Sequence, residues 1–171
     1  MAMALLLATA LALVGFVFTS VQGFAVTAGP LVTRHVGYAI PTVLFSLFSQ
    51  SMVIFYFLGT GKMVKEETLG LPEAERAAIL AALRRFKMQT SPPATFALLS
   101  AIAVFVLGGA THTRALPSWA HLASAIAASG THLWALMVEA RTFAENNRLM
   151  DDPRAYARGA GVDPSSRSST R

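Results

Sequence analysis

The sequence has no cysteine and few charged residues. None of its 171 residues is Cys, which excludes disulfide-stapled folds, thiolate metal sites and cysteine nucleophiles. Asp, Glu, Lys and Arg together make up 13% of the chain, against ~25% in typical soluble domains, whereas hydrophobic residues make up 54%. A water-soluble domain of this length cannot easily cover its surface with so few charges. The composition therefore indicates a membrane protein.

The scarce charges leave four long stretches that contain none. These are Met1–Thr33, His35–Gly61, Met88–Thr113 and Ala115–Val138, of 33, 27, 26 and 24 residues. An apolar helix of ~20 residues crosses the ~30 Å hydrocarbon core of a bilayer, and charges at its centre are costly. The sequence therefore predicts an all-α integral membrane four-helix bundle, with spans at about 4–25, 38–58, 92–109 and 117–138.

The first and the fourth predicted spans are less clear than the other two. The first run has the length of a cleaved signal peptide, but no Lys or Arg precedes it and no clear Ala-x-Ala motif lies before Arg34. The last run is the most polar, because Ser, Thr and two histidines dilute it. Prolines in a first turn suit a helix start, so Ser91-Pro92-Pro93 is predicted to begin the third span, and Gly108-Gly109 to end it.

The basic residues predict the orientation. Twelve of the fourteen Lys and Arg residues lie between the second and third spans or after the fourth; the other two are Arg34 and Arg114. Because basic loops stay in the cytoplasm, both termini are predicted to lie inside, in a multi-pass protein of the cell (inner) membrane. The net charge of +5 then reflects contact with lipid headgroups, and we expect no nucleic-acid partner.

Two further segments are predicted to be cytoplasmic. Residues 72–88 place Glu73 and Glu75 in the first turn and Arg84 and Arg85 in the last turn of an amphipathic helix, which complements the helix dipole. This helix is expected either to lie on the inner leaflet or to dock a partner. The C-terminal residues 151–171, rich in Gly, Ser and Arg towards their end, are predicted to be a disordered tail.

One face of the fourth span carries ionisable side chains. His121, His132 and Glu139 are separated by 11 and 7 residues, which returns them to one side of a helix. Gln50 belongs to a polar stripe on the second span and is expected at the depth of His132. Such stripes either hold helices together through hydrogen bonds or form a site around His132: a proton relay, a quinone contact, or a haem with Met52 as the opposite ligand.

The other histidines suggest a second candidate site. His35, His112 and His121 are all predicted near the outer interface, at the ends of three different spans. Three imidazoles form a typical ligand set for Zn or Cu, although exposed loop histidines are commoner.

The sequence favours an accessory, assembly or scaffold subunit of a larger membrane complex, with the lipid bilayer and other membrane subunits, or a second copy, as partners. The first alternative is a membrane redox or ligand-binding protein that uses haem, a metal or a quinone. The second alternative is an oligomeric transporter or channel. We expect no hydrolytic activity, because no Ser/His/Asp arrangement, His-Glu-x-x-His motif or paired carboxylate is present.

Overall fold

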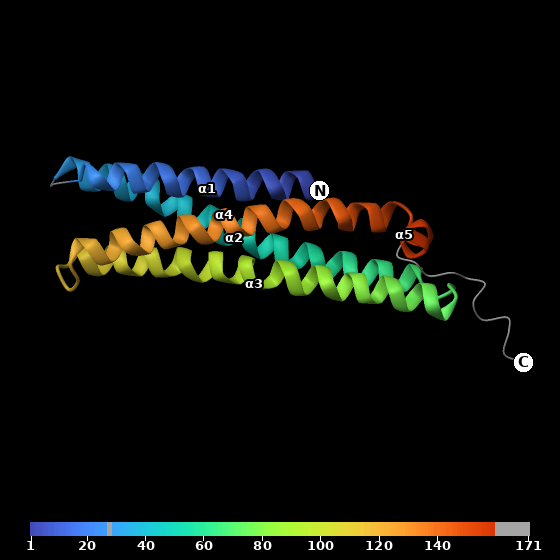
Figure 1. Ribbon diagram of the computed structural model, residues 1–171. Coiled ribbons are helices and arrows are strands. Elements are labelled where there is room, and N and C mark those ends of the chain that lie inside the picture. The colour runs from blue at the N-terminus through green and yellow to red at the C-terminus, as the bar shows by residue number, and fades with distance from the viewer. Residues whose placement is uncertain (27–28, 160–171) are drawn as a thin grey trace, which may run out of the picture.

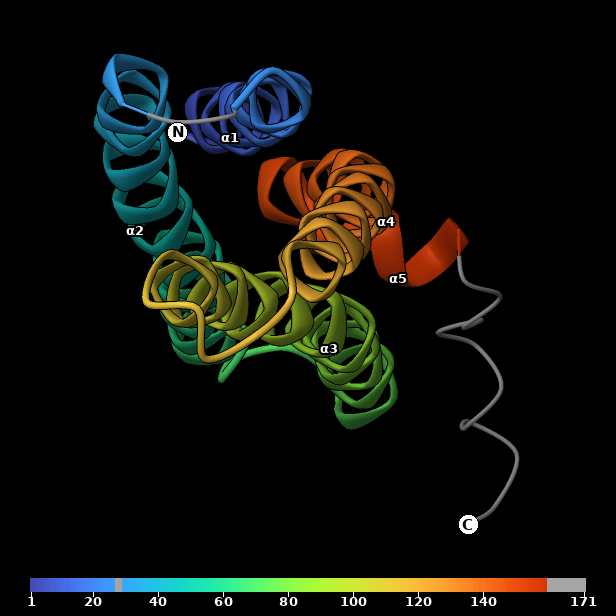
Figure 2. The same cartoon turned by 90° about the vertical axis from the view of Figure 1, so that its left-hand side faces the viewer.

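The computed structural model describes residues 1–26 and 29–159, and these ranges contain helices and no strand. The helices are α1 (Ala2–Phe24), α2 (Pro30–Glu67), α3 (Glu73–His112), α4 (Ser118–Asp151) and α5 (Pro153–Gly159). The all-α prediction is confirmed. The first four helices run side by side along one axis (Figure 1). Seen end-on in Figure 2, α4 lies between α1 and α3, and α2 closes the other side.

Buried residues recur along each of three helices with alternating steps of three and four. In α1 they are Ala2, Leu5, Thr9, Ala12, Phe16 and Thr19. In α2 they include Val43, Ser46, Gln50, Val53, Phe57, Thr60 and Val64. In α4 they include Ala125, Ala128, His132, Ala135, Glu139, Thr142, Asn146 and Leu149. A repeat of seven keeps one seam of each helix against its neighbours, as in left-handed coiled-coil packing.

The helices differ in length, which divides the molecule into two halves. The 23 residues of α1 extend for about 35 Å, whereas α2, α3 and α4 have 38, 40 and 34 residues and extend for about 50–60 Å. The N-terminus therefore lies near the middle of the structure (Figure 1). We call residues 1–26, 29–61 and 88–138 the apolar half, and residues 62–87 and 139–159 the charged half.

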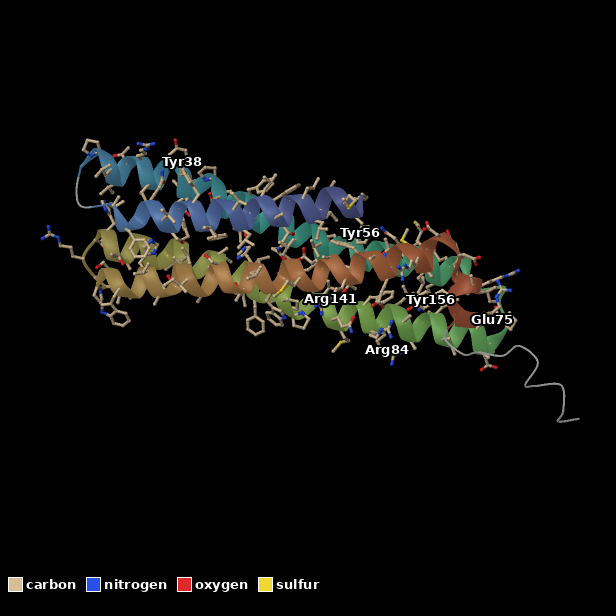
Figure 3. All side chains as sticks on the ribbon, turned by 45° about the horizontal axis from the view of Figure 1, so that its top comes forward. Tyr38, Tyr56, Glu75, Arg84, Arg141 and Tyr156 are labelled. Carbon is tan, nitrogen blue, oxygen red and sulfur yellow. The ribbon has the colours of Figure 1, made fainter. Side chains whose placement is uncertain are left out.

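The surfaces of the two halves are of opposite character. Among residues 1–26 and 29–159, 32 large hydrophobic side chains are exposed, and all but Met63 and Leu69 lie in the apolar half. The charged half instead exposes ionic side chains over a packed core that includes Val64, Ile79, Phe86 and Leu149. In Figure 3, the labelled residues Glu75, Arg84 and Tyr156 lie towards α5, far from Tyr38. No part of the chain that the structure describes covers this apolar surface.

Three helices are long and apolar enough to cross a membrane: α1, α2 and α3. Two of them extend beyond the predicted spans. The second was predicted at 38–58, but α2 begins at Pro30 and continues to Glu67. The glycines at 59 and 61 do not end it, because Val53, Phe57, Thr60 and Val64 continue the buried seam on the same face. Packing of the seam outweighs the low helix propensity of two glycines.

The predicted separate amphipathic helix at 72–88 is corrected by the structure. It is the first part of α3, which continues without interruption through Pro92-Pro93 to His112. The prolines keep helical φ angles and remove only two N–H donors, while Ala94, Ala97 and Ala101 beyond them are fully buried. The predicted end at Gly108-Gly109 is also wrong, because α3 ends at His112 and Arg114 takes the left-handed conformation, with φ at 61°. Ala115 N–H then bonds Ala110 O at 2.9 Å, which closes the helix end.

The predicted disordered tail begins with a short helix. After α4 ends at Asp151, the Asp152 carboxylate accepts a hydrogen bond from Ala155 N–H at 2.9 Å and caps α5. α5 packs on α3 and α4, and the Tyr156 hydroxyl accepts a hydrogen bond of 3.0 Å from Arg85, which is also paired with Glu145. The rest of that prediction, residues 160–171, lies outside the described residues.

Candidate functional site

A column of buried polar side chains runs along the α4 seam. His132, Glu139 and Asn146 follow one another at intervals of seven residues, and each has no exposed surface. At about 1.5 Å per residue, successive members lie about 10 Å apart along the helix. Polar groups so deeply buried are costly unless they are paired, so the partners of each decide what it can do.

His132 is held on three sides. Its Nδ1 lies 2.7 Å from Ala128 O, one turn back on α4, and its Nε2 lies 2.5 Å from the Ser46 hydroxyl of α2. A carbonyl only accepts, so Nδ1 carries the hydrogen and, in the neutral ring, Nε2 accepts from Ser46. The Phe16 ring of α1 covers the imidazole at a centroid distance of 4.4 Å. Three helices thus meet at this histidine.

The geometry does not bring together the haem ligands that the sequence suggested. The Nε2 atom of His132 is already occupied by Ser46, and Gln50 lies one turn further along α2. Met52 is six residues from Ser46, about 9 Å along the axis, and packs against a different hydrophobic cluster. Ligation by His132 would require loss of the Ser46 hydrogen bond. The arrangement therefore suits a structural link between α1, α2 and α4.

This link predicts a stability difference between two serine variants. Ser46→Ala leaves His132 Nε2 buried without a donor, which is expected to cost about 1–3 kcal/mol. Ser129→Ala is the control, because the Ser129 hydroxyl bonds only Ala125 O of its own helix, and we expect it to cost under about 0.5 kcal/mol. Thermal unfolding in mild detergent, followed by circular dichroism, measures both. Equal melting temperatures would show that the Ser46 contact is not formed.

A second set of polar groups meets one heptad away. Thr9 of α1 and Gln50 of α2 face Glu139 of α4, and all three are fully buried. Gln50 Nε2 donates to Thr9 Oγ1 at 3.4 Å. The Thr9 hydroxyl and the Gln50 amide are the polar groups nearest the Glu139 carboxylate, but neither of its oxygens, nor Gln50 Oε1, has a partner in full hydrogen-bond geometry within the described ranges. Glu139 is therefore buried between three helices.

The column ends at Asn146 in the charged half. The Asn146 amide donates to the Tyr56 hydroxyl at 3.3 Å, and that hydroxyl lies 3.1 Å from Asn147 Oδ1. Tyr56 also packs edge-on against Phe57 and Phe143, with centroid distances of 5.3 and 5.1 Å. These contacts join α2 to α4 within the hydrophobic cluster that also contains Ala2 and Leu5 of α1. The Asn146 amide nitrogen is thus paired, whereas its Oδ1 has no hydrogen-bond partner among the described residues.

The outer histidines are only partly brought together. His35 and His121 pack edge to face with ring centroids 6.2 Å apart, and both are partly buried. His112, at the end of α3, is exposed. In residues 1–26 and 29–159, no group of three His, Cys, Asp or Glu side chains is arranged to hold a metal ion. The pair instead fits close helix packing, since a Cβ at Gly108 would lie only 3.0 Å from His121 Cε1.

Reasoning from the sequence missed the contribution of α1. Thr9 and Phe16 are seven residues apart and each completes one layer of the polar column. The first run reads as uniformly apolar, so neither residue stands out by composition. The seven-residue spacing shared with His132 and Glu139 is the signal by which both could have been found.

Comparison with known proteins leaves the function to be argued from the molecule itself. No protein-family profile matches the chain, and no curated protein or solved structure is significantly similar to it.

Proposed function

We propose that the chain is a four-span inner-membrane protein with both termini in the cytoplasm, and that it serves as an accessory or assembly subunit of a membrane complex. The observation that carries this proposal is the distribution of exposed large hydrophobic side chains, nearly all of which surround the apolar half. A bilayer covers such a surface, whereas water would not. Within the apolar half, the segments of α1, α3 and α4 are about 30–40 Å long, close to the thickness of a bilayer core, and the segment of α2 is longer, at about 48 Å.

The proposal includes α4 as the fourth span, although α4 is less apolar than α1, α2 and α3. Its polar residues are turned inward or satisfied locally: His132 is buried, and the hydroxyls of Ser124 and Ser129 bond carbonyls of their own helix. Its exposed side chains between 118 and 138 include Trp119, Ile126, Leu133, Trp134 and Met137. A low average hydropathy therefore coexists with an apolar outer face. Such a helix suits a position between lipid and a polar bundle interior.

The charged half is proposed to project into the cytoplasm. It contains most of the Lys and Arg residues between 62 and 158, and basic segments next to spans stay inside. Its length beyond the membrane, about 15–20 Å, lets α3, α4 and α5 present side chains to a partner. This projecting helical unit is the part of the molecule that distinguishes an assembly role from a purely lipid-embedded one.

One surface of the charged half suits a partner of defined chemistry. A shallow groove of about 540 Å³ follows α3 and is lined by Ala77, Leu80, Ala81, Arg84, Arg85 and Met88. Small side chains along its floor allow another helix to approach closely. Arg84 is exposed at its rim, and Arg85 already pairs with Glu145. We therefore expect an amphipathic cytoplasmic helix with acidic residues, from another membrane subunit, to dock there.

Site-specific photocrosslinking in living cells tests the assembly role. A benzoylphenylalanine at Ala81 is expected to give one discrete protein adduct, because this position lies in the groove. Arg84→Glu should reduce that adduct on the order of ten-fold by reversing the charge at the rim. A probe at the exposed Lys65 of α2 is the matched control and should not form the same adduct. Absence of a protein adduct at Ala81, or one that Arg84→Glu leaves unchanged, would contradict docking at this surface.

A further inference from the structure

The contact between α1, α2 and α4 around Glu139 is unusual because it is rich in acceptors and lacks a cation. Glu139 Oε1, Glu139 Oε2 and Gln50 Oε1 are three buried oxygens with no donor in full hydrogen-bond geometry, and the nearest polar groups to the carboxylate are the Thr9 hydroxyl and the Gln50 amide, neither of which carries a charge. The Thr9 hydroxyl stands beside them and already accepts from the Gln50 amide. The three residues come from three helices and none has any exposed surface.

No charged side chain in the described ranges balances the Glu139 carboxylate. The groups that face it are Thr9 of α1 and Gln50 of α2, and no titratable group of α3 or α5 acts on it. On α4 itself, His132 lies about 10 Å away along the axis, and Arg141 is exposed on another face. Burying an unpaired carboxylate is strongly unfavourable, so a positive charge has to accompany Glu139 in the folded protein.

The site lies where the two halves meet, because Glu139 is the first residue of the charged half on α4 whereas Thr9 and Gln50 belong to the apolar half. Gln50 is eleven residues before Gly61, the last residue of the charge-free run in α2, which corresponds to about 16 Å. Thr9 likewise lies well inside α1. An ionisable group enclosed by spans generally marks an ion or proton site, because its burial costs stability without contributing apolar packing.

The chemistry of the donors selects the kind of ion. A carboxylate, an amide carbonyl and a hydroxyl are all hard oxygen donors, without the nitrogen or sulfur that transition metals favour. Their total charge is −1, so one monovalent cation neutralises the site, whereas a divalent ion would leave a buried positive charge. We propose that Glu139, Gln50 and Thr9 form an exchangeable site for one small monovalent cation, either a hydrogen ion or a sodium ion.

The two occupants use the same oxygens in different ways. A hydrogen ion on Glu139 turns the carboxyl into a donor to the free Gln50 Oε1. A sodium ion is instead coordinated by the Glu139 carboxylate, Gln50 Oε1 and Thr9 Oγ1. Both give the free acceptors a positive partner, and both explain why the cluster carries a carboxylate with no basic residue beside it.

Labelling of the full chain with dicyclohexylcarbodiimide tests the site. This reagent partitions into apolar regions and modifies protonated carboxyl groups there, and mass spectrometry of the peptides locates the adduct. We expect Glu139 to be the modified residue in mild detergent. If sodium is the occupant, sodium chloride should slow the labelling on the order of ten-fold relative to choline chloride at equal pH and ionic strength. If the hydrogen ion is the occupant, labelling should fall with rising pH equally in both salts.

Three variants complete the experiment. Glu139→Gln should abolish the labelling while the protein keeps its helicity, because the amide replaces the neutralised carboxyl. Glu145→Gln, six residues further along α4 in a solvent-exposed ion pair, should leave the labelling unchanged. Gln50→Leu removes one oxygen donor and should shift the sodium concentration or pH of half-protection on the order of ten-fold.

Two results would overturn the proposal. One is a Glu139 that stays unlabelled at every pH in the absence of sodium, since an exchangeable carboxyl must react. The other is a labelling rate that neither sodium nor pH changes. Labelling of Glu139 does not require a partner protein. The labelling experiment and the crosslinking experiment at α3 can therefore fail independently of each other.

Discussion

Replacing Gly15 with leucine is expected to lower the melting temperature by about 2–12 °C, through separation of α1 from α2. A Cβ at Gly15 would lie 2.8 Å from Thr42 Cγ2 and 3.0 Å from Thr42 Oγ1, which real packing does not allow. Thr42 cannot rotate away freely, because it is β-branched and its hydroxyl donates to Tyr38 O at 2.8 Å. Overpacking of this kind costs about 1–3 kcal/mol, and a chain of this size loses ~2–4 °C per kcal/mol.

A second glycine provides the control for this prediction. A Cβ at Gly37, in α2, meets nothing within 4 Å. Gly37→Leu therefore adds no steric conflict, and leucine's better helix propensity should leave the melting temperature equal or higher. Circular dichroism in the same detergent compares the two variants. Similar destabilisation by both would mean that α1 does not approach α2 at Gly15.

The second large effect is expected from Phe86→Ala in the charged half. Phe86 is 1% exposed and packs in the hydrophobic cluster that includes Ile79 and Leu149, next to Tyr156 of α5. Truncation of a buried phenylalanine removes apolar contacts and leaves a cavity, at a cost of about 3–5 kcal/mol. We expect the charged half to unfold without cooperativity. In hydrogen-exchange measurements, the amides of residues 62–87 and 139–159 should exchange faster than in the unmodified protein.

Phe105→Ala is the matched comparison on the same helix. Phe105 is 52% exposed in the apolar half, where the proposed arrangement has detergent or lipid covering the side chain before and after truncation. Its loss should change stability by less than about 1 kcal/mol, because no water-excluding core is opened. A Phe105 variant as unstable as the Phe86 variant would mean that the apolar surface is covered by protein and not by lipid.

The sequence predicted the helical class and located the apolar segments, but not the ends of the helices. Charge-free runs are a direct physical requirement of a bilayer, so α1, α2 and α3 stand out from composition alone. The extension of α2 past Gly61 and the fusion of residues 72–88 with the next span depend on packing between helices. A local signal such as Pro92-Pro93 indicates where a helix can start. It does not show whether packing against neighbouring helices lets an earlier helix continue through the same residues.

The candidate site was predicted in outline. The common face of His121, His132 and Glu139, and the polar stripe with Gln50, follow from helical periodicity. The pairing of His132 with Ser46, and of Glu139 with Gln50 and Thr9, depends on the axial register between helices, which periodicity does not fix. The axial register also brings His35 and His121 into contact and leaves His112 exposed. Helical periodicity could not predict this difference.

The most direct test of the membrane arrangement is the accessibility of single cysteines, for which the cysteine-free chain is ideal. Thr113→Cys lies in the turn between α3 and α4, and Ala155→Cys lies on the exposed side of α5. A membrane-impermeant maleimide should label Thr113→Cys in intact cells, and Ala155→Cys only after permeabilisation. Labelling of both in intact cells would contradict the fourth span, and labelling of Ala155→Cys alone would contradict the orientation.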